Sequence, residues 1–326
     1  MLAVPLLEVE NLQAEFRTPG GIVQAVRGVS FRVERGETVG IVGESGSGKS
    51  ATALALMRLI PTPPGSITGG AVRLDGEELL SLPERQMQRV RGARMAMVFQ
   101  DPFSSLNPTM TLGEQVAESI RLHTGASRAE AKAQTLRLFQ AVRLPSPEIR
   151  YRQYPHQVSG GQRQRVMIAI AFACNPELLI ADEPTTALDV TVQAQVLALM
   201  GALQKRTDAG VLLITHDLGV VAEVCDRVLV MYAGTIVESG TVEQIFTAPK
   251  HPYTQGLLAS LPQINVERNQ RLPSIPGQPP DLAHLPPGCP FYDRCPKRMP
   301  DICPSREPEP TTPQPGQRVR CFLYGG

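Results

Sequence analysis

A glycine-rich segment at residues 43–50 is the first candidate for chemistry in this chain of 326 residues. It reads G-E-S-G-S-G-K-S and lies between an apolar run, Glu37 to Gly43, and a helix-compatible run, Ala51 to Ile60. Glycines let consecutive backbone N–H groups face one concavity, which suits an anion. Lys49 offers a compact charge to the β- and γ-phosphates of a nucleotide, and the Ser50 hydroxyl can ligate Mg²⁺. The pattern predicts a nucleotide-phosphate site, and the alternative is a flexible Gly/Ser turn.

Two adjacent carboxylates form the second candidate. The apolar run Leu178 to Ala181 leads into Asp182 and Glu183, at the carboxyl edge of a predicted sheet, where ligands bind in open α/β folds. Because successive side chains of a strand point to opposite faces, the two acids are expected to have different roles. Asp182 is predicted to hold the Mg²⁺ shell, and Glu183 to orient or deprotonate the attacking water. The alternative is a solvated pair at a strand end.

The third candidate is the start of a predicted helix over residues 163–174. Ser159 and Gln162 fit a capping box, in which side chains satisfy the first free amides of the helix. Gly160 and Gly161 occupy the first two helical positions, where glycine is poor for stability. Without side chains these amides stay open to an incoming oxyanion, which the helix dipole also favours. The alternative is an ordinary N-cap.

Short apolar runs must position these candidates. Residues 37–43, 178–182 and 211–216 are rich in Val, Ile and Leu and are separated by helical patterns. Such runs favour a parallel sheet covered on both faces, hence an α/β fold. Between residues 101 and 158 the pattern is helical, which predicts a helical insert in this core.

Two capping boxes are predicted inside the insert. Thr111 with Glu114, and Ser127 with Glu130, have the required spacing. Each pair therefore predicts the start of a helix.

Composition excludes several classes of protein. Hydrophobic residues make up 42% and charged residues 19%, which is ordinary for a globular protein and excludes disorder over the whole length. With 32 Lys and Arg against 31 Asp and Glu, a strongly basic nucleic-acid footprint is absent. Apolar runs are too short to span a bilayer, and residues 1–10 lack a signal-peptide pattern, so a cytosolic chain is expected.

Proline and cysteine concentrate near the C-terminus. Residues 273–315 hold 14 of the 30 prolines, which excludes regular helix or central strand there. We place a boundary near residue 246 and predict a small, loop-rich second domain over residues 246–326. In a reducing cytosol, clustered thiols favour a metal over disulfides, and thiolate ligation suits zinc or an iron–sulfur cluster. The four cysteines of this segment are Cys289, Cys295, Cys303 and Cys321.

Taken together, these motifs resemble those of the nucleotide-binding subunit of ATP-binding-cassette (ABC) transporters. Gly43–Ser50 is similar to the Walker A loop, Leu178–Glu183 to the Walker B strand, and Ser159–Gln162 to the signature, preceded here by Val158. Three further elements resemble the Q-loop, the D-loop and the switch histidine: Gln100, Ala187-Leu188-Asp189 and His216.

The resemblance implies a fold and a mechanism. Residues 1–245 would form a P-loop NTPase core with an antiparallel β subdomain and a helical insert at about residues 101–160. ATP and Mg²⁺ would be sandwiched between two such domains. Ser50, Gln100 and Asp182 would hold the metal, while Glu183, His216 and Gln100 would act in hydrolysis. The implied nucleotide-binding residues are Phe16 (stacking on adenine), Gly43, Ser45, Gly46, Gly48, Lys49, Ser50 and Thr52, with Ser159, Gly160, Gly161, Gln162 and Asp189 acting across the dimer.

A narrower resemblance is to the ATPase subunits of dipeptide and oligopeptide importers. Residues 250–262 contain H-P-Y-T, and C-P-F begins at Cys289. This resemblance implies that the chain powers peptide import and is bound at the cytoplasmic face of the cell membrane. The implied partners are two permease subunits, a second and paralogous ATPase and, indirectly, a peptide-binding protein; no nucleic-acid partner is expected. It also favours a [4Fe-4S] cluster over zinc at the four cysteines. Nickel, glutathione or oligosaccharide remain alternative cargoes, and a soluble ABC ATPase of DNA repair or translation is the rival class.

Overall fold

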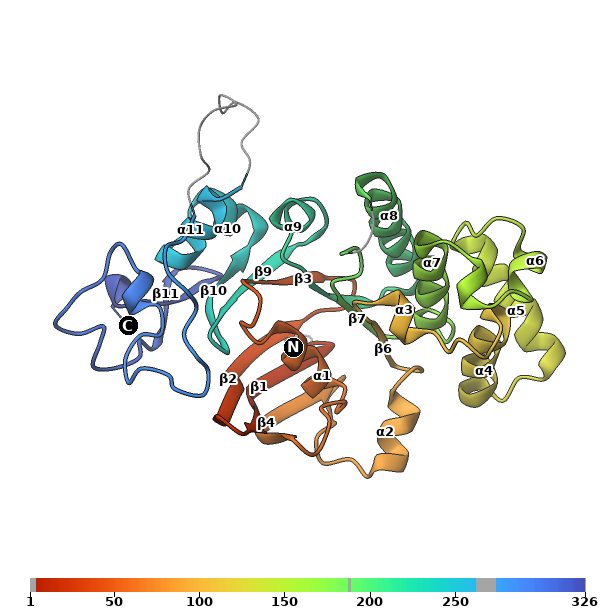
Figure 1. Ribbon diagram of the computed structural model, residues 1–326, viewed down its shortest axis with the longest axis horizontal. Helices are drawn as coiled ribbons and strands as arrows, with labels where there is room; N and C mark the ends of the chain where they lie inside the picture. The colour runs from red at the N-terminus through yellow and green to blue at the C-terminus, as the bar shows by residue number, and fades with distance from the viewer. Residues whose placement is uncertain (1–3, 187–188, 262–273, 326) are drawn as a thin grey trace. The chain divides into compact units, whose positions relative to one another are not determined.

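The computed structural model describes residues 4–186, 189–261 and 274–325, and they form two compact units that alternate along the chain (Figure 1). Unit 1 comprises Met1–Leu7, Val33–Thr38 and Arg73–Ile214, and unit 2 comprises Glu8–Arg32, Val39–Val72 and Thr215–Gly326. The domain boundary that the sequence predicts near residue 246 does not coincide with an edge of either unit and stays a prediction.

Unit 1 contains parallel strands at its centre. Strand β7 (Leu178–Asp182) pairs in parallel with β6 (Met95–Val98) on one side and with β8 (Gly210–Ile214) on the other. Every residue of β7 and β8 is buried, which explains why these runs, apart from Asp182 at the end of β7, are continuously apolar instead of alternating. The parallel arrangement is confirmed, and β8 ends two residues earlier than predicted.

Four helices of unit 1, α4 to α7, pack against one another in a group coloured yellow to green in Figure 1. Helix α4 contacts α5, α6 and α7, and α5 also contacts α6 and α7. The remaining helices of the unit are α2, α3 and α8. Their bounds are α2 Glu84–Val90, α3 Pro102–Ser105, α4 Leu112–Thr124, α5 Arg128–Ala141, α6 Pro147–Tyr151, the 3₁₀ turn η1 Pro155–Gln157, α7 Gly160–Ala171 and α8 Val190–Thr207.

One of the two capping boxes predicted in this region is complete. At Ser127 and Glu130 both reciprocal hydrogen bonds are present. The prediction at Thr111 was half wrong: its side chain accepts from the backbone N–H of Glu114, but the return bond is missing. The Glu114 carboxylate instead accepts a hydrogen bond of 2.9 Å from the Tyr151 hydroxyl, so a tertiary contact displaces the local one.

Unit 2 combines two groups of strands. Strands β2 (Gly21–Val33), β1 (Leu7–Thr18) and β4 (Gly65–Leu74) lie side by side in one sheet, and the last residues of β4 pair antiparallel with β5 (Glu77–Glu78) in unit 1. In the second group, β3 (Thr38–Val42) pairs in parallel with β9 (Arg227–Tyr232). Strand β10 (Thr235–Thr241) then pairs antiparallel with β9 and with β12 (Gln317–Arg320).

The C-terminal extension, residues 246–326, is built on this second group. The strand β11 (Pro310–Gln314) pairs with β12 at the end of the strand order, an edge position that tolerates proline. Between residues 274 and 309 the structure contains one 3₁₀ turn, η2 (Tyr292–Arg294), and no α-helix, as the prolines predict. The other helical segments of unit 2 are α1 Lys49–Leu56, α9 Leu218–Val224, α10 Val242–Thr247, α11 Pro252–Ala259 and η3 Phe322–Tyr324.

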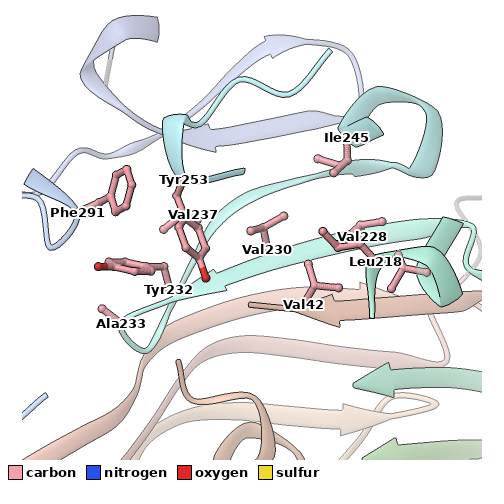
Figure 2. Packing of buried hydrophobic residues seen from close by; sticks show 11 residues of the cluster. Val42, Leu218, Val228, Val230, Tyr232, Ala233, Val237, Ile245, Tyr253 and Phe291 are labelled. Atoms are coloured by element: carbon pink, nitrogen blue, oxygen red, sulfur yellow. The ribbon is translucent and has the colours of Figure 1, made fainter. Parts of the chain in front are cut away.

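A buried aromatic group joins the extension to the strands of unit 2 (Figure 2). The ring of Phe291 packs at 5.3 Å from that of Tyr232, on β9, and at 5.5 Å from that of Tyr253, on α11. All three side chains are at most 2% exposed. The C-P-F segment therefore supplies a core residue that connects the extension to the strands of unit 2.

None of the described helices has both the length and the apolar character needed to cross a membrane.

Candidate functional site

The phosphate loop, residues 43–50, runs from the end of β3 into the first turn of α1, and it needs glycine at residues 43 and 48. Gly43 and Gly48 have φ of +153° and +106°, values that side-chain-bearing residues rarely adopt. A Cβ at Gly43 would lie 2.2 Å from the Met231 carbonyl oxygen, and one at Gly48 would lie 2.2 Å from that of Ala25. The loop backbone is therefore packed directly against neighbouring backbone.

Lys49 is held inside this loop. Its ammonium donates to the carbonyl oxygens of Gly43 at 2.8 Å and Glu44 at 2.9 Å, and the residue is buried. At the start of α1, Thr52 donates from its hydroxyl to the Gly48 carbonyl. These contacts fix the position of the charge that the sequence assigned to the nucleotide phosphates.

Ser47 is a loop residue that the sequence reasoning missed. Its hydroxyl is buried and is one of four buried side-chain polar atoms among the described residues that lack a hydrogen-bond partner. An orphaned buried hydroxyl is costly. Its presence within the phosphate loop fits a site that receives an oxygen-rich ligand. The signal available in the sequence was its place inside the G-E-S-G-S-G-K-S pattern.

The carboxylates after β7 lie in unit 1. Asp182 is the last residue of the strand and is buried. Glu183 has φ +45°, a strained conformation for a non-glycine residue that is typical of functional positions. Its carboxylate accepts hydrogen bonds from the Gln100 side-chain amide at 3.1 Å and the Thr186 hydroxyl at 2.7 Å. The structure thus brings together two of the three residues that were predicted to act in hydrolysis.

The capping box predicted at the start of α7 is confirmed. Ser159 and Gln162 exchange their two hydrogen bonds at 3.4 Å each. A Cβ at Gly160 would meet no atom within 4 Å, whereas one at Gly161 would lie 3.1 Å from a Val192 methyl group. Space is therefore open beside the first amide of the helix.

The remaining predicted residues are placed separately. Asp189 caps α8, accepting from the Val192 N–H at 3.0 Å, while Ala187 and Leu188 of the same motif lie outside the described residues. His216 follows β8 and is exposed, and Phe16 on β1 is half-buried. Phe16, the phosphate loop and His216 belong to unit 2. The candidates of the ATP site in unit 1 are Gln100, Ser159–Gln162, Asp182, Glu183 and Asp189.

The four cysteines of the extension line one small cavity, together with His251 and Phe291. Burial raises the pKa of the Cys289 thiol to about 12 and also raises the pKa values of Cys295 and Cys321. The donor set matches the Cys₄ sets of zinc and [4Fe-4S] sites in residue type.

The predicted metal site is nevertheless not supported by the side-chain arrangement. No group of three or more His, Cys, Asp or Glu among the described residues is placed to hold a metal ion. The cavity measures about 20 Å³, room for roughly one water molecule. A metal or cluster would therefore require these side chains to rearrange.

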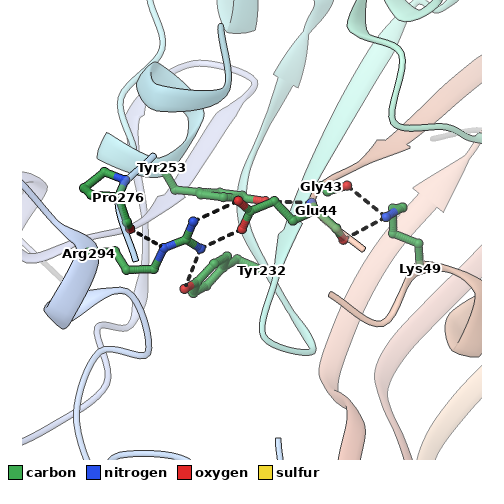
Figure 3. A network of polar contacts seen from close by, with 7 residues as sticks. All are labelled: Gly43, Glu44, Lys49, Tyr232, Tyr253, Pro276 and Arg294. Atoms are coloured by element: carbon green, nitrogen blue, oxygen red, sulfur yellow. Dashed lines mark hydrogen bonds and ion pairs between the residues drawn. The ribbon is translucent and has the colours of Figure 1, made fainter. Parts of the chain in front are cut away.

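The extension also contacts the phosphate loop (Figure 3). The guanidinium of Arg294 forms a two-point ion pair with the Glu44 carboxylate, with N–O distances of 2.6 and 2.9 Å. The Glu44 backbone N–H donates to the Tyr253 hydroxyl at 2.8 Å. Sequence reasoning gave no role to Glu44, Tyr253 or Arg294.

Comparison with known proteins covers both parts of the chain. Residues 26–186 match the family model described as ABC transporter, and residues 237–303 match the model described as oligopeptide/dipeptide transporter, C-terminal region. The chain is 56% identical over 286 residues to the oligopeptide transport ATP-binding protein OppD of Bacillus subtilis, covering 88% of this chain and 80% of that protein. It is 50% identical over 318 residues to the dipeptide transport ATP-binding protein DppD of the same organism, covering 98% and 94%.

Solved structures agree with the fold. A dimeric ATP-binding cassette, MJ0796, bound to ADP and Pi in a post-hydrolysis state, matches with a TM-score of 0.65 at 28% sequence identity. The match covers 72% of this chain and 98% of that one.

Proposed function

The chain belongs to the ABC transporter family, among the oligopeptide and dipeptide transport ATP-binding proteins, and we propose that it powers the import of di- and oligopeptides. It is an ABC-type ATPase. The observation that carries the peptide assignment is the match of residues 237–303 to the C-terminal region of peptide transporters. A soluble ABC ATPase of DNA repair or translation would not need this segment, and neither would a general phosphate-loop enzyme.

Within the ATP site, the residues divide by role. The phosphate loop binds the phosphates through its amides and Lys49, and Phe16 stacks on the adenine. Ser50, Gln100 and Asp182 hold Mg²⁺, which supplies charge neutralisation at the phosphates. The hydrogen bond from Gln100 to Glu183 supports a shared catalytic position for these two side chains.

Glu183 orients or deprotonates the attacking water, and His216 also acts in hydrolysis. A second cassette provides its Ser159–Gln162 helix start to the same ATP. The open space beside Gly160 supports the approach of an oxyanion to this helix start. Loss of the γ-phosphate contacts then lets the dimer open.

Membrane permease partners follow from membership of an ABC importer family. More specifically, the chain is bound peripherally at the cytoplasmic face of the cell membrane, with two permease subunits, a paralogous second ATPase and a peptide-binding protein that acts indirectly. Near-neutral net charge supports the exclusion of nucleic acid. Nickel, glutathione and oligosaccharide remain alternative cargoes for the same motor.

Cys289, Cys295, Cys303 and Cys321 bind a [4Fe-4S] cluster in the oxygen-free protein, with zinc as the alternative. All four cysteines line one cavity, which supports this proposal, and such a group would add links between the segments of this proline-rich region. Anaerobic purification followed by visible absorption and iron analysis tests it. Colourless, zinc-loaded protein would contradict the cluster, and metal-free protein would contradict both.

The function itself is tested by purifying the tagged full-length chain from solubilised membranes. We expect a pair of peptide permeases to co-purify and peptide to stimulate ATP hydrolysis by the complex. Ribosomes, DNA-repair proteins or a permease for another cargo would contradict the assignment.

Glu183→Gln is expected to retain ATP binding and to reduce hydrolysis at least about 100-fold. Glu177→Gln is the matched control, because Glu177 pairs with Arg94 and has no proposed role in hydrolysis. A wild-type rate of ATP hydrolysis in Glu183→Gln would contradict the proposed role of Glu183.

A further inference from the structure

We propose that Arg294 and Tyr253, both in the C-terminal extension, are positioning residues of the phosphate loop and determine its affinity for ATP through Glu44. The inference rests on the proposed function, because it assigns the extension a role at the same nucleotide site. The relevant contacts all lie within unit 2.

Glu44 is the second residue of the loop and is held at three points. Its carbonyl oxygen accepts from Lys49, its backbone N–H donates to the Tyr253 hydroxyl, and its carboxylate pairs with Arg294. Figure 3 shows Lys49 and Arg294 on opposite sides of Glu44. The residue that orients the phosphate-binding ammonium is therefore itself fixed by the extension.

The ion pair also offsets the negative charge of Glu44. A carboxylate within a loop that binds a triphosphate adds negative charge where a polyanion must bind, and unpaired like charges repel. Arg294 compensates this charge with a two-point contact, the strongest geometry for a guanidinium and a carboxylate. Only 28% of the Glu44 side chain is exposed, so water screens the carboxylate weakly if its partner is lost.

Arg294 is well fixed for this role. Its side chain is only 5% exposed, and two further groups hold the guanidinium: Nε donates to the Pro276 carbonyl at 2.9 Å and Nη1 donates to the Tyr232 hydroxyl at 3.3 Å. The hydrogen bonds to Glu44 raise the pKa of Arg294, which keeps the guanidinium charged.

Tyr253 supplies an independent contact. It belongs to the H-P-Y-T segment and is fully buried, with its ring 4.6 Å from that of Tyr232. Its hydroxyl accepts from the backbone of Glu44, so this contact does not depend on the carboxylate. The H-P-Y-T segment is therefore more than an ordered connection between two domains.

The test is equilibrium binding of a fluorescent ATP analogue to the full-length chain. Arg294→Met leaves the Glu44 carboxylate unpaired, and we expect affinity to fall at least about tenfold. Glu44→Gln removes the charge, so both it and the double variant Glu44→Gln/Arg294→Met should remain within about threefold of wild type. Rescue by the second substitution is a result that a purely structural role of Arg294 would not produce.

Tyr253→Phe provides a second readout. It leaves the Glu44 N–H without its acceptor, so affinity should fall about three- to tenfold, and Glu44→Gln should not restore it. In the assembled transporter, both Arg294→Met and Tyr253→Phe should raise KM for ATP and leave kcat nearly unchanged, because the catalytic groups remain in place.

Glu307→Gln is the control for loss of an extension ion pair elsewhere. Glu307 pairs with Arg27 on β2, and this variant should bind ATP like the wild type. If Arg294→Met does not fold, Arg294→Lys keeps the charge with one contact point and should bind ATP more weakly than wild type, with recovery by Glu44→Gln.

Equal affinities of wild type and the Arg294 variants, or no rescue in the double variant, would overturn the inference. If the wild-type chain binds no nucleotide, the proposed function fails instead.

Discussion

Replacing Phe291 with alanine tests whether the extension is docked through the aromatic group. The ring is 2% exposed and lies within 6 Å of the rings of Tyr232, Tyr253 and His251. Deleting such a buried ring leaves a cavity and removes its apolar contacts, which costs about 3–5 kcal/mol in the free energy of unfolding. The expected result is a loss of this size in urea denaturation followed by circular dichroism, together with faster proteolysis of the extension.

Leu323→Ala is the matched control for Phe291→Ala. Leu323 also belongs to the extension, but its side chain is 41% exposed, so the free energy of unfolding should change by no more than about 0.5 kcal/mol. If the two variants unfold at the same urea concentration, the aromatic group does not dock the extension, and the packing argument is wrong.

Three further outcomes follow from single residues. Gly48→Ala should lower the free energy of unfolding by more than about 3 kcal/mol, because the new Cβ would clash with a carbonyl oxygen and the backbone φ is unfavourable for alanine. In the same denaturation assay Gly46→Ala should lower the free energy of unfolding by only about 1 kcal/mol, because no atom lies within 4 Å of its Cβ. Ser159→Ala should cost about 1 kcal/mol of stability through the lost cap and should reduce ATP hydrolysis by the complex far more than ATP binding. Burial raises the pKa of Cys225 to about 12. Its alkylation in the native chain, followed by mass spectrometry, should therefore be about a thousandfold slower at pH 8 than that of a thiol of ordinary pKa. The alkylation rate should still increase with pH above pH 9.

The strands and the loops that follow them could be predicted from local sequence. The run Leu178–Ala181 is apolar throughout because both faces of its sheet are covered, and the strand Leu178–Asp182 was predicted with its observed bounds. Residues 43–50 and the cap at Ser159 are encoded within eight residues or fewer. Functional motifs whose residues lie so close together in the sequence can be identified before any tertiary structure is known.

Contacts between distant residues could not be predicted in this way. Glu44 and Arg294 are 250 positions apart, and neither belongs to a periodic pattern that would mark it as paired. The missing half of the Thr111 cap has the same cause, since Tyr151 competes for the carboxylate of Glu114. The four cysteines could be grouped by residue type into one shared site, and they do line one cavity, but their spacing did not reveal the arrangement of their side chains.

The short segment from Cys289 to Cys295 links three features of the extension. It carries two of the four thiols that line the cavity, the ring of Phe291 and the guanidinium of Arg294. Because the prolines of this region exclude a helix or a sheet that could hold it, its position depends on a few side-chain contacts. One of those contacts is with the phosphate loop. Any change that displaces this segment should therefore alter Glu44, so the geometry that docks the extension and the geometry that binds ATP share the same residues.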